Sequence, residues 1–312
     1  MILRSERENF LQFADQVGMS IKENELQRIK VKFRKNFVFL PELILSFGSY
    51  VITKDFMRKS TSNNLKDSIC FFFHNVFDDE QTDNKTKAWE ETPHVRIFPT
   101  RLPQVTRFRK NTNVKIVSVI VSADYLRSFL NQEVEVYQYL FDERHDFLIE
   151  EIMTDDILRT VNEIVKKEEP AALKSYHYKL KAMELLFYLF QSLSKRERSL
   201  HQKLSENDIK SMYKVRDKLI SSLDKPTPIS TLKQIAGMNE LKMRKFFMQV
   251  FGMGIYDYYQ RLRMKEAARL LREKKLSVSE TGYEMGFENL SHFSRVFEKH
   301  IGKKPKKYCA EC

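Results

Sequence analysis

Cysteine is scarce in this chain of 312 residues, which has only Cys70, Cys309 and Cys312. Three cysteines do not make a disulfide framework, so a reducing compartment such as the cytoplasm is expected. The last two form a CxxC, but a zinc site would need two further ligands from elsewhere. The seven histidines are scattered and contain no His-x-His pair. We therefore expect neither a metal nor a cofactor.

Long apolar stretches are also missing. No apolar run approaches the ~20 residues of a membrane span, and no early segment resembles a signal peptide. Membrane association is therefore not expected. The sequence also shows no Ser-His-Asp set, no glycine-rich phosphate loop and no arrangement of paired carboxylates. These absences argue against an enzyme.

Positive charge is plentiful and unevenly distributed. The net charge is +12, from 54 Lys and Arg residues against 42 Asp and Glu residues. Residues 212–312 hold 21 of the basic and 11 of the acidic residues, which leaves +10 there and +2 elsewhere. A positive field confined to one region is typical of a module that binds phosphates.

That basic region contains the same short unit twice, about fifty positions apart. At an offset of fifty, matching positions include Asn239 and Asn289, Met243 and Phe293, Phe247 and Phe297, Gly252 and Gly302, and Tyr258 and Tyr308. Just upstream the offset is forty-nine, which pairs Gly237 with Gly286 and leaves Glu288 as an extra residue in an expected turn. Each unit predicts a short helix, a glycine turn and a longer helix begun by an Asn cap. Two helix-turn-helix units on a basic chain indicate double-stranded DNA as a partner.

The sequence as a whole predicts an α+β protein of two domains, residues 1–205 and 206–312. Short stretches rich in Val, Ile and Phe over residues 29–121 predict a small antiparallel sandwich or barrel, and helical spacing follows over 122–205. The second domain is predicted to be all-α. Its helix-turn-helix units, residues 229–251 and 278–301, are joined by a linker helix over 255–274.

The longer helix of each unit has one polar side that is expected to face DNA. The outward residues and a following basic pair are Leu241, Lys242, Arg244, Lys245, Gln249, Ser291, His292, Ser294, Arg295, Lys303 and Lys304. A linker helix of twenty residues spans about 30 Å, close to the ~34 Å turn of B-DNA. One chain is thus expected to place two recognition helices in successive major-groove segments. The linker's own exposed arginines, Arg263 among them, are either phosphate contacts or a solvated face.

The first domain offers two weaker patterns. Apolar residues spaced alternately three and four apart form a coiled-coil seam on a helix over about 171–198, and they predict a homodimer. These residues are Tyr176, Leu180, Met183, Phe187 and Phe190. The alternative is that the helix only packs on the β-rich part. Arg96, Arg107 and Arg109 lie near expected strand ends and predict a pocket for an anionic effector, with ordinary basic loops as the alternative.

The segments that carry a family resemblance are STLKQIAGMNELKMRKFFMQVFGMGIYDYYQRLRMKEAARLL and SVSETGYEMGFENLSHFSRVFEKHIGKKPKKY. Over about residues 212–308 the chain resembles the DNA-binding domain of the AraC/XylS family of bacterial transcription regulators. The resemblance implies base contacts at Leu241, Arg244, Lys245, Ser291, His292 and Arg295. It also implies, more weakly, a cupin-like first domain that binds an effector and dimerises. Lys233 stands where the family usually has alanine, and Cys309 where it usually has arginine.

These patterns predict a sequence-specific transcription regulator, with activation favoured over repression. The expected partners are double-stranded DNA, a second copy of the chain, RNA polymerase and a small effector. One alternative is a constitutive architectural DNA-binding protein. Another is an enzyme with a DNA-binding appendage, such as the alkyl-transfer repair proteins, but those need a nucleophilic cysteine in a zinc-bound set of four, which three cysteines do not supply.

Overall fold

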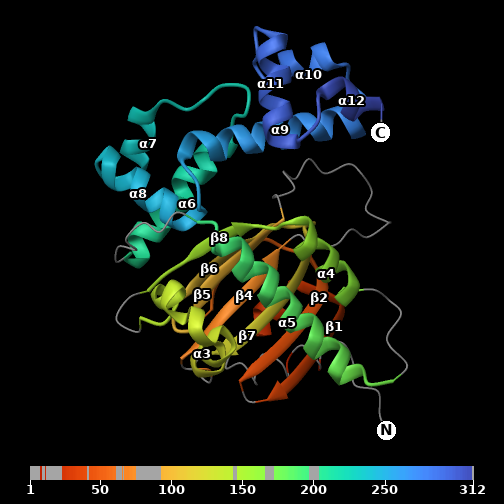
Figure 1. The fold of residues 1–312 in the computed structure, drawn as a ribbon, viewed down its shortest axis with the longest axis vertical. Helices are drawn as coiled ribbons and strands as arrows, with labels where there is room; N and C mark the ends of the chain where they lie inside the picture. The colour runs from red at the N-terminus through yellow and green to blue at the C-terminus, as the bar shows by residue number, and fades with distance from the viewer. Residues whose placement is uncertain are drawn as a thin grey trace. The chain divides into compact units, whose positions relative to one another are not determined.

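The computed structural model describes residues 8, 11, 23–40, 42–60, 65, 67–74, 93–142, 146–165, 172–196 and 204–310. The chain divides into two compact units, Met1–Lys203 and Leu204–Cys312. The first unit is built on antiparallel strands followed by helices, and the second is entirely helical in its described part (Figure 1). The predicted α+β class is therefore confirmed.

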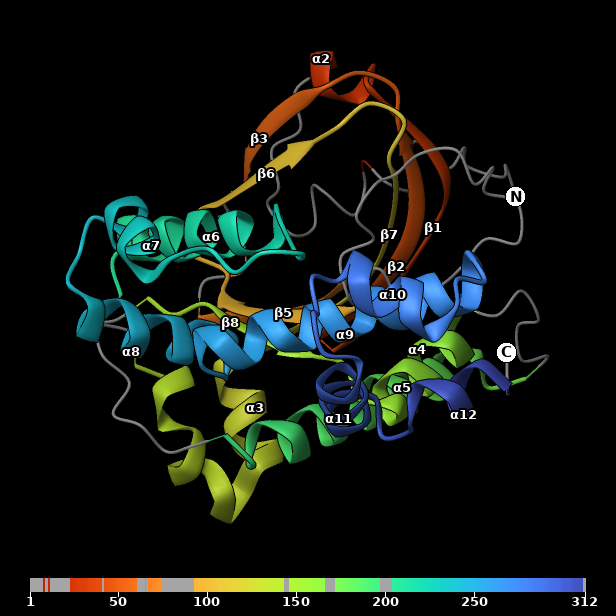
Figure 2. The ribbon, with the colours of Figure 1, turned by 90° about the horizontal axis from the view of Figure 1, so that it is seen from above.

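The first unit contains two antiparallel sheets. Six strands hydrogen-bond in the order β1-β2-β7-β4-β5-β8. Strands β3 and β6 pair in a separate two-stranded sheet and lie side by side in Figure 2. The strand bounds are β1 Ile29–Leu40, β2 Leu43–Ile52, β3 Phe56–Ser60, β4 Ser68–His74, β5 His94–Pro99, β6 Gln104–Phe108, β7 Asn113–Ser122 and β8 Ile149–Ile152. Strand β8 corrects the expectation that everything after residue 121 is helical. It follows the first two helices after β7 and returns to the sheet beside β5, where Ile149 pairs with Ile97.

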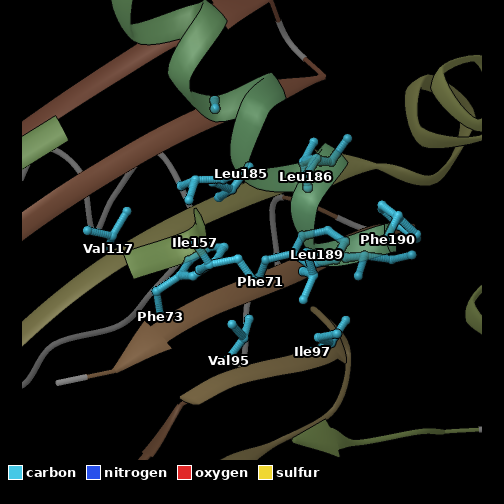
Figure 3. Close-up of a cluster of buried hydrophobic side chains, with 14 of the residues drawn as sticks. Phe71, Phe73, Val95, Ile97, Val117, Ile157, Leu185, Leu186, Leu189 and Phe190 are labelled. Atoms are coloured by element: carbon cyan, nitrogen blue, oxygen red, sulfur yellow. The ribbon is translucent and has the colours of Figure 1, made fainter. Parts of the chain in front are cut away.

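Helices cover one face of the larger sheet. They are α3 Ala123–Leu130, the 3₁₀ helix η1 Asn131–Leu140, α4 Asp155–Val165 and α5 Lys174–Leu193, while the short α2 Glu23–Leu26 precedes β1. Inward residues of the strands, such as Phe71 and Val117, pack against Leu185 and Leu189 of α5 and Ile157 of α4 (Figure 3). Each such side chain contributes about 1.5–3 kcal/mol when fully buried. This apolar layer holds α5 on the sheet.

The opposite face of the same sheet is more polar. Side chains alternate along a strand, so the residues between the core positions point away from α5. They include the buried Arg34, Ser46, Ser118, His94 and Glu150. Buried charges require polar partners, and Arg34 donates to the Ser46 hydroxyl at 2.5 Å. The first unit thus has one apolar sheet face and one mixed face, called the polar face below, on which these polar residues lie among apolar ones such as Cys70 and Ile120.

The second unit consists of shorter helices arranged around one long helix. The helices are α6 Glu206–Ile220, α7 Ile229–Ala236, α8 Glu240–Phe251, α9 Ile255–Glu273, α10 Val278–Glu284, α11 Leu290–Ile301 and α12 Pro305–Ala310. Helix α9 runs unbroken, with α7 and α8 at one end and α10, α11 and α12 at the other (Figure 1). Among the described residues, no helix is both long and apolar enough to cross a membrane.

Candidate nucleic-acid interface

The two repeated units share the same backbone turns. In each unit an asparagine side chain caps the second helix, since Asn239 accepts from the Lys242 amide and Asn289 from the His292 amide, both at 2.9 Å. The glycines in the turns and after the helices all have positive φ, a conformation that glycine adopts without strain. They are Gly237 at 65°, Gly286 at 71°, Gly252 at 71° and Gly302 at 83°. The sequence repeat is therefore also a repeat of local structure.

Aromatic rings fix helix α8 of the first unit against α9. Met243, Phe246, Phe247 and Val250 lie on the buried side of α8. The Phe247 ring lies 4.5 Å from the Phe251 ring and 5.4 Å from the Tyr258 ring of α9, centroid to centroid. Because this buried side is fixed, the orientation of the opposite side of α8 is fixed as well.

Helix α11 of the second unit is held in a similar way. Phe293 and Phe297 are fully buried with Met264 and Leu271 of α9. The Phe297 ring meets the Tyr308 ring of α12 edge-on at 5.6 Å. Helix α12 therefore closes this small core, although the sequence pattern did not reveal it as a helix.

The structure corrects the predicted position of Arg263 in the linker helix. It was assigned to the exposed side of α9, but only 6% of the residue is exposed. Its guanidinium lies 4.2 Å from the Phe287 ring centroid and 5.3 Å from that of Tyr259, and it donates to the Met285 carbonyl. Burial lowers the pKa of Arg263 from its ordinary value. The residue ties α9 to the turn of the second unit and does not face solvent.

The predicted outward residues of α8 are exposed, with one exception. Leu241 is 67% exposed, and Lys245 also lies on the surface. Lys242 Nζ lies 3.2 Å from Asp208 Oδ1 of α6, and Arg244 Nε lies 2.8 Å from Glu240 Oε1. Asp208 and Glu240 orient these two basic side chains, and the sequence analysis had assigned them no such role.

Gln249 is the exception, and its outward placement was wrong. The residue is only 7% exposed and lies among the buried positions of α8. Its polarity suggested the outer side, but it lies between Met248 and Val250 at the edge of the apolar stripe. Lys233 of α7 is exposed, so the departure from the family's alanine places no charge in the core.

The second unit presents a different set of side chains. Ser291, His292 and Arg295 are exposed on α11, and Ser294 is half-buried. The His292 ring stands edge-on to the Phe287 ring at 5.5 Å, which restrains its position. The basic pair Lys303 and Lys304 is exposed between α11 and α12.

The three arginines assigned to an effector pocket lie in different elements. Arg96 of β5 is on the polar face of the six-stranded sheet, where its Nε lies 3.7 Å from Glu150 Oε2. Arg107 belongs to β6 of the two-stranded sheet, with its side chain outside the described residues, and the exposed Arg109 follows that strand. Arg34 and Arg58, which sequence reasoning missed, are buried at 6% and 8% exposure.

The seam on α5 is only partly exposed. Tyr176, Leu180 and Phe187 are 68%, 69% and 55% exposed, which is unusual for large apolar residues. The prediction that Phe190 belongs to this exposed seam is wrong. Its ring is buried in the core, edge-on to Phe71 at 6.1 Å. Met183 is half-buried against the same core.

Comparison with known proteins bears on the second unit. A family model described as "Helix-turn-helix domain" matches residues 232–311, which include most of the first repeated unit and all of the second. One similar solved structure is a transcriptional regulator from Chromobacterium violaceum, whose title mentions an AraC-type DNA-binding domain. The two chains are 20% identical, and the match covers 34% of this chain and 96% of the other, with a TM-score of 0.32. The second unit is a helix-turn-helix domain.

The curated relatives that the chain matches are transcription regulators by name. The regulatory protein PchR of Pseudomonas aeruginosa is 32% identical over 99 residues, which are 31% of this chain and 33% of PchR. The transcriptional activator RhaR of Escherichia coli is 30% identical over 126 residues, which are 40% of this chain and 45% of RhaR. The chain thus spans less than half the length of these relatives.

Two further solved structures are similar. The DNA-binding domain of AdpA, described as a global transcriptional factor and solved with a target DNA, is 23% identical. It covers 32% of this chain and 91% of its own, with a TM-score of 0.31. ToxT of Vibrio cholerae covers 85% of this chain and 97% of its own, at 14% identity and a TM-score of 0.31.

Proposed function

We propose that this protein is a sequence-specific transcription regulator in which each chain reads two adjacent major-groove segments. The observation that carries the proposal is the pair of like-capped helices, α8 and α11, at opposite ends of one unbroken helix. Helix α9 has 19 residues, so it spans about 28 Å at about 1.5 Å per residue. That length suits two readers about one turn of B-DNA apart.

Two basic residues carry the strongest expected base contacts. Lys245 and Arg295 occupy equivalent positions in the two units, and both are exposed. Lysine and arginine bond the O6 and N7 atoms of guanine in the major groove. Lys303 and Lys304 would contact phosphates and add affinity without sequence preference.

The test is genomic mapping of binding sites for the tagged protein, followed by footprinting of one mapped site. Lys245→Ala and Arg295→Ala should each weaken binding to that site by about 1–3 kcal/mol and relax preference at one base pair. Lys214→Ala is a matched control, because it removes an exposed positive charge from α6 outside the recognition helices. Footprints that neither recognition-helix substitution changes would overturn the proposal.

The proposed sign of regulation is activation, which the name of RhaR as an activator favours. The proposal therefore includes RNA polymerase as a partner. Transcription in vitro from a mapped promoter should rise on addition of the protein, and a fall would assign repression. An enzymatic role is not proposed, because the matched relatives are named as regulators.

The exposed seam on α5 supports a homodimer as part of this function. Three large apolar side chains on one helix favour burial against a second copy. Leu180→Asp should shift the protein from dimer to monomer in analytical ultracentrifugation. Ser175→Asp adds the same charge at an exposed position outside the seam and should leave the dimer intact. A wild-type chain that sediments as a monomer would rule out dimerisation through the seam.

We also propose that the first unit binds an anionic effector on the polar face of its larger sheet. Arg34 and Arg96 place a buried and a half-buried guanidinium group on this face, and Arg58 adds a buried one from β3 of the two-stranded sheet. Guanidinium groups bind carboxylates and phosphates in bidentate geometry. Arg96→Gln should abolish any shift in operator affinity caused by small anionic metabolites of a cell extract. Operator affinity that no extract component changes would favour the constitutive architectural protein instead.

A further inference from the structure

The two recognition helices differ at the position that enters a groove first. Leu241 and Ser291 are the second residues of α8 and α11, each two positions after its capping asparagine. Both side chains therefore leave equivalent backbone positions near the start of the helix. One unit presents an isobutyl group there, and the other presents a hydroxyl group.

Leu241 lies on a side of α8 that otherwise carries charges. The residue is 67% exposed, although leucine is among the residues most often fully buried. Its neighbours Lys242 and Arg244 are drawn to Asp208 and Glu240, at 3.2 and 2.8 Å. Lys242 Nζ also lies 4.9 Å from the centroid of the Phe246 ring. These contacts give the two basic side chains preferred positions, and no described contact covers the leucine.

The base edges in the major groove offer one kind of partner for such a side chain. Donors and acceptors line the groove, and the C5-methyl group of thymine is the apolar group among them. We propose that Leu241 reads thymine through this methyl group, so that the segment bound by the first unit carries a thymine that Leu241 contacts. The hydroxyl group of Ser291 gives no such preference for thymine in the second segment. The proposal rests on the proposed function, because it specifies what one reader recognises.

The experiment uses the full chain and DNA selected from random duplexes by repeated binding. Lys245→Ala and Arg295→Ala are each carried through the same selection. The segment whose base preference relaxes in a variant is the one that the altered unit contacts. Each thymine of the selected site is then replaced singly by deoxyuridine, which keeps its base pairing and removes only the methyl group. Dissociation constants are measured at one fixed salt concentration.

One thymine in the first segment should be sensitive to its methyl group. Burying one methyl group is worth about a fourfold change in affinity, so its replacement by deoxyuridine should weaken binding by about that factor. In Leu241→Ala this sensitivity should disappear. Ser291→Ala and Lys245→Ala should keep it, although Lys245→Ala weakens binding overall. Because Leu241 is exposed, its replacement by alanine leaves the helical core intact.

Three results would overturn the proposal. They are a first segment without thymine, deoxyuridine replacements that change nothing, and a methyl effect that persists in Leu241→Ala. In each of these cases a selected site still exists, so the proposed function stands. A selection that enriches no sequence at all removes the proposed function and this inference together.

Discussion

The turn glycines Gly237 and Gly286 offer a matched test of how the two units are built. They are equivalent in the repeat, and their φ angles are 65° and 71°. Replacing each by alanine imposes the same backbone cost, because a Cβ atom disfavours this conformation by about 1–2 kcal/mol. Any difference between the two variants must then come from what surrounds each turn.

The surroundings differ strongly. A Cβ atom on Gly237 would meet no atom within 4 Å, whereas one on Gly286 would lie 2.0 Å from the Asp224 carbonyl oxygen. The obstacle is backbone of the loop between α6 and α7, which cannot rotate away as a long side chain would. Forcing extra atoms into a packed site costs about 1–3 kcal/mol in addition. Gly286→Ala should therefore cost about 2–5 kcal/mol, and Gly237→Ala about 1–2 kcal/mol.

Hydrogen exchange followed by mass spectrometry on the full chain can measure both costs. Each 1.4 kcal/mol lost in local opening free energy speeds exchange of the affected amides about tenfold. In Gly286→Ala the amides of α10 and α11 should exchange at least thirtyfold faster. In Gly237→Ala those of α7 and α8 should change by about five- to thirtyfold. Equal effects would show that the approach of Asp224 to Gly286 does not restrict the turn.

Three further predictions concern single side chains. Arg263→Lys should weaken protection of α10 and α11, because an ammonium group cannot stack flat on two rings as a guanidinium does. Gln249→Ala should leave the base preference of the selected site unchanged, since the residue is buried. Burial opposes ionisation of Asp208, but hydrogen bonds from Ser205 and the charge of Lys242 hold its pKa below the ordinary value. The contribution of ionised Asp208 to the free energy of unfolding is therefore full above about pH 4 and is lost as the pH falls through the lowered pKa. On acidification the melting temperature of the wild type should fall more steeply than that of Asp208→Asn.

The helices of the second unit were predictable because their signals are local. Capping asparagines, turn glycines and apolar spacing act within a few residues of each other, and the repeat presents them twice. Helix α9, Ile255–Glu273, lies where the linker helix was expected. The prediction of residues on the outer surface also used local spacing, and it placed the exposed Leu241, Lys245 and Arg295 correctly on that surface.

The errors arose where tertiary contacts overrule local polarity. Gln249 is polar, yet it lies at the edge of the apolar stripe and is buried. Arg263 is buried because Tyr259 and Phe287, which are 28 positions apart, bring two rings to its guanidinium. Strand β8 has four residues, too few for an alternating pattern to be recognised. Phe190 fitted a heptad seam, but its side of α5 faces the sheet.

The two repeated units share a backbone plan but differ in their outward side chains, and under the proposed function this difference has a consequence for the DNA. The outward residues pair as Leu241 with Ser291, Lys242 with His292, Arg244 with Ser294, and Lys245 with Arg295. Only the last pair has a lysine or an arginine in both units. Two identical readers would favour two segments of the same sequence, whereas unlike readers favour two different sequences. The divergence of the repeats therefore predicts that the two segments read by one chain differ in sequence, and that each unit has its own preferred base pairs.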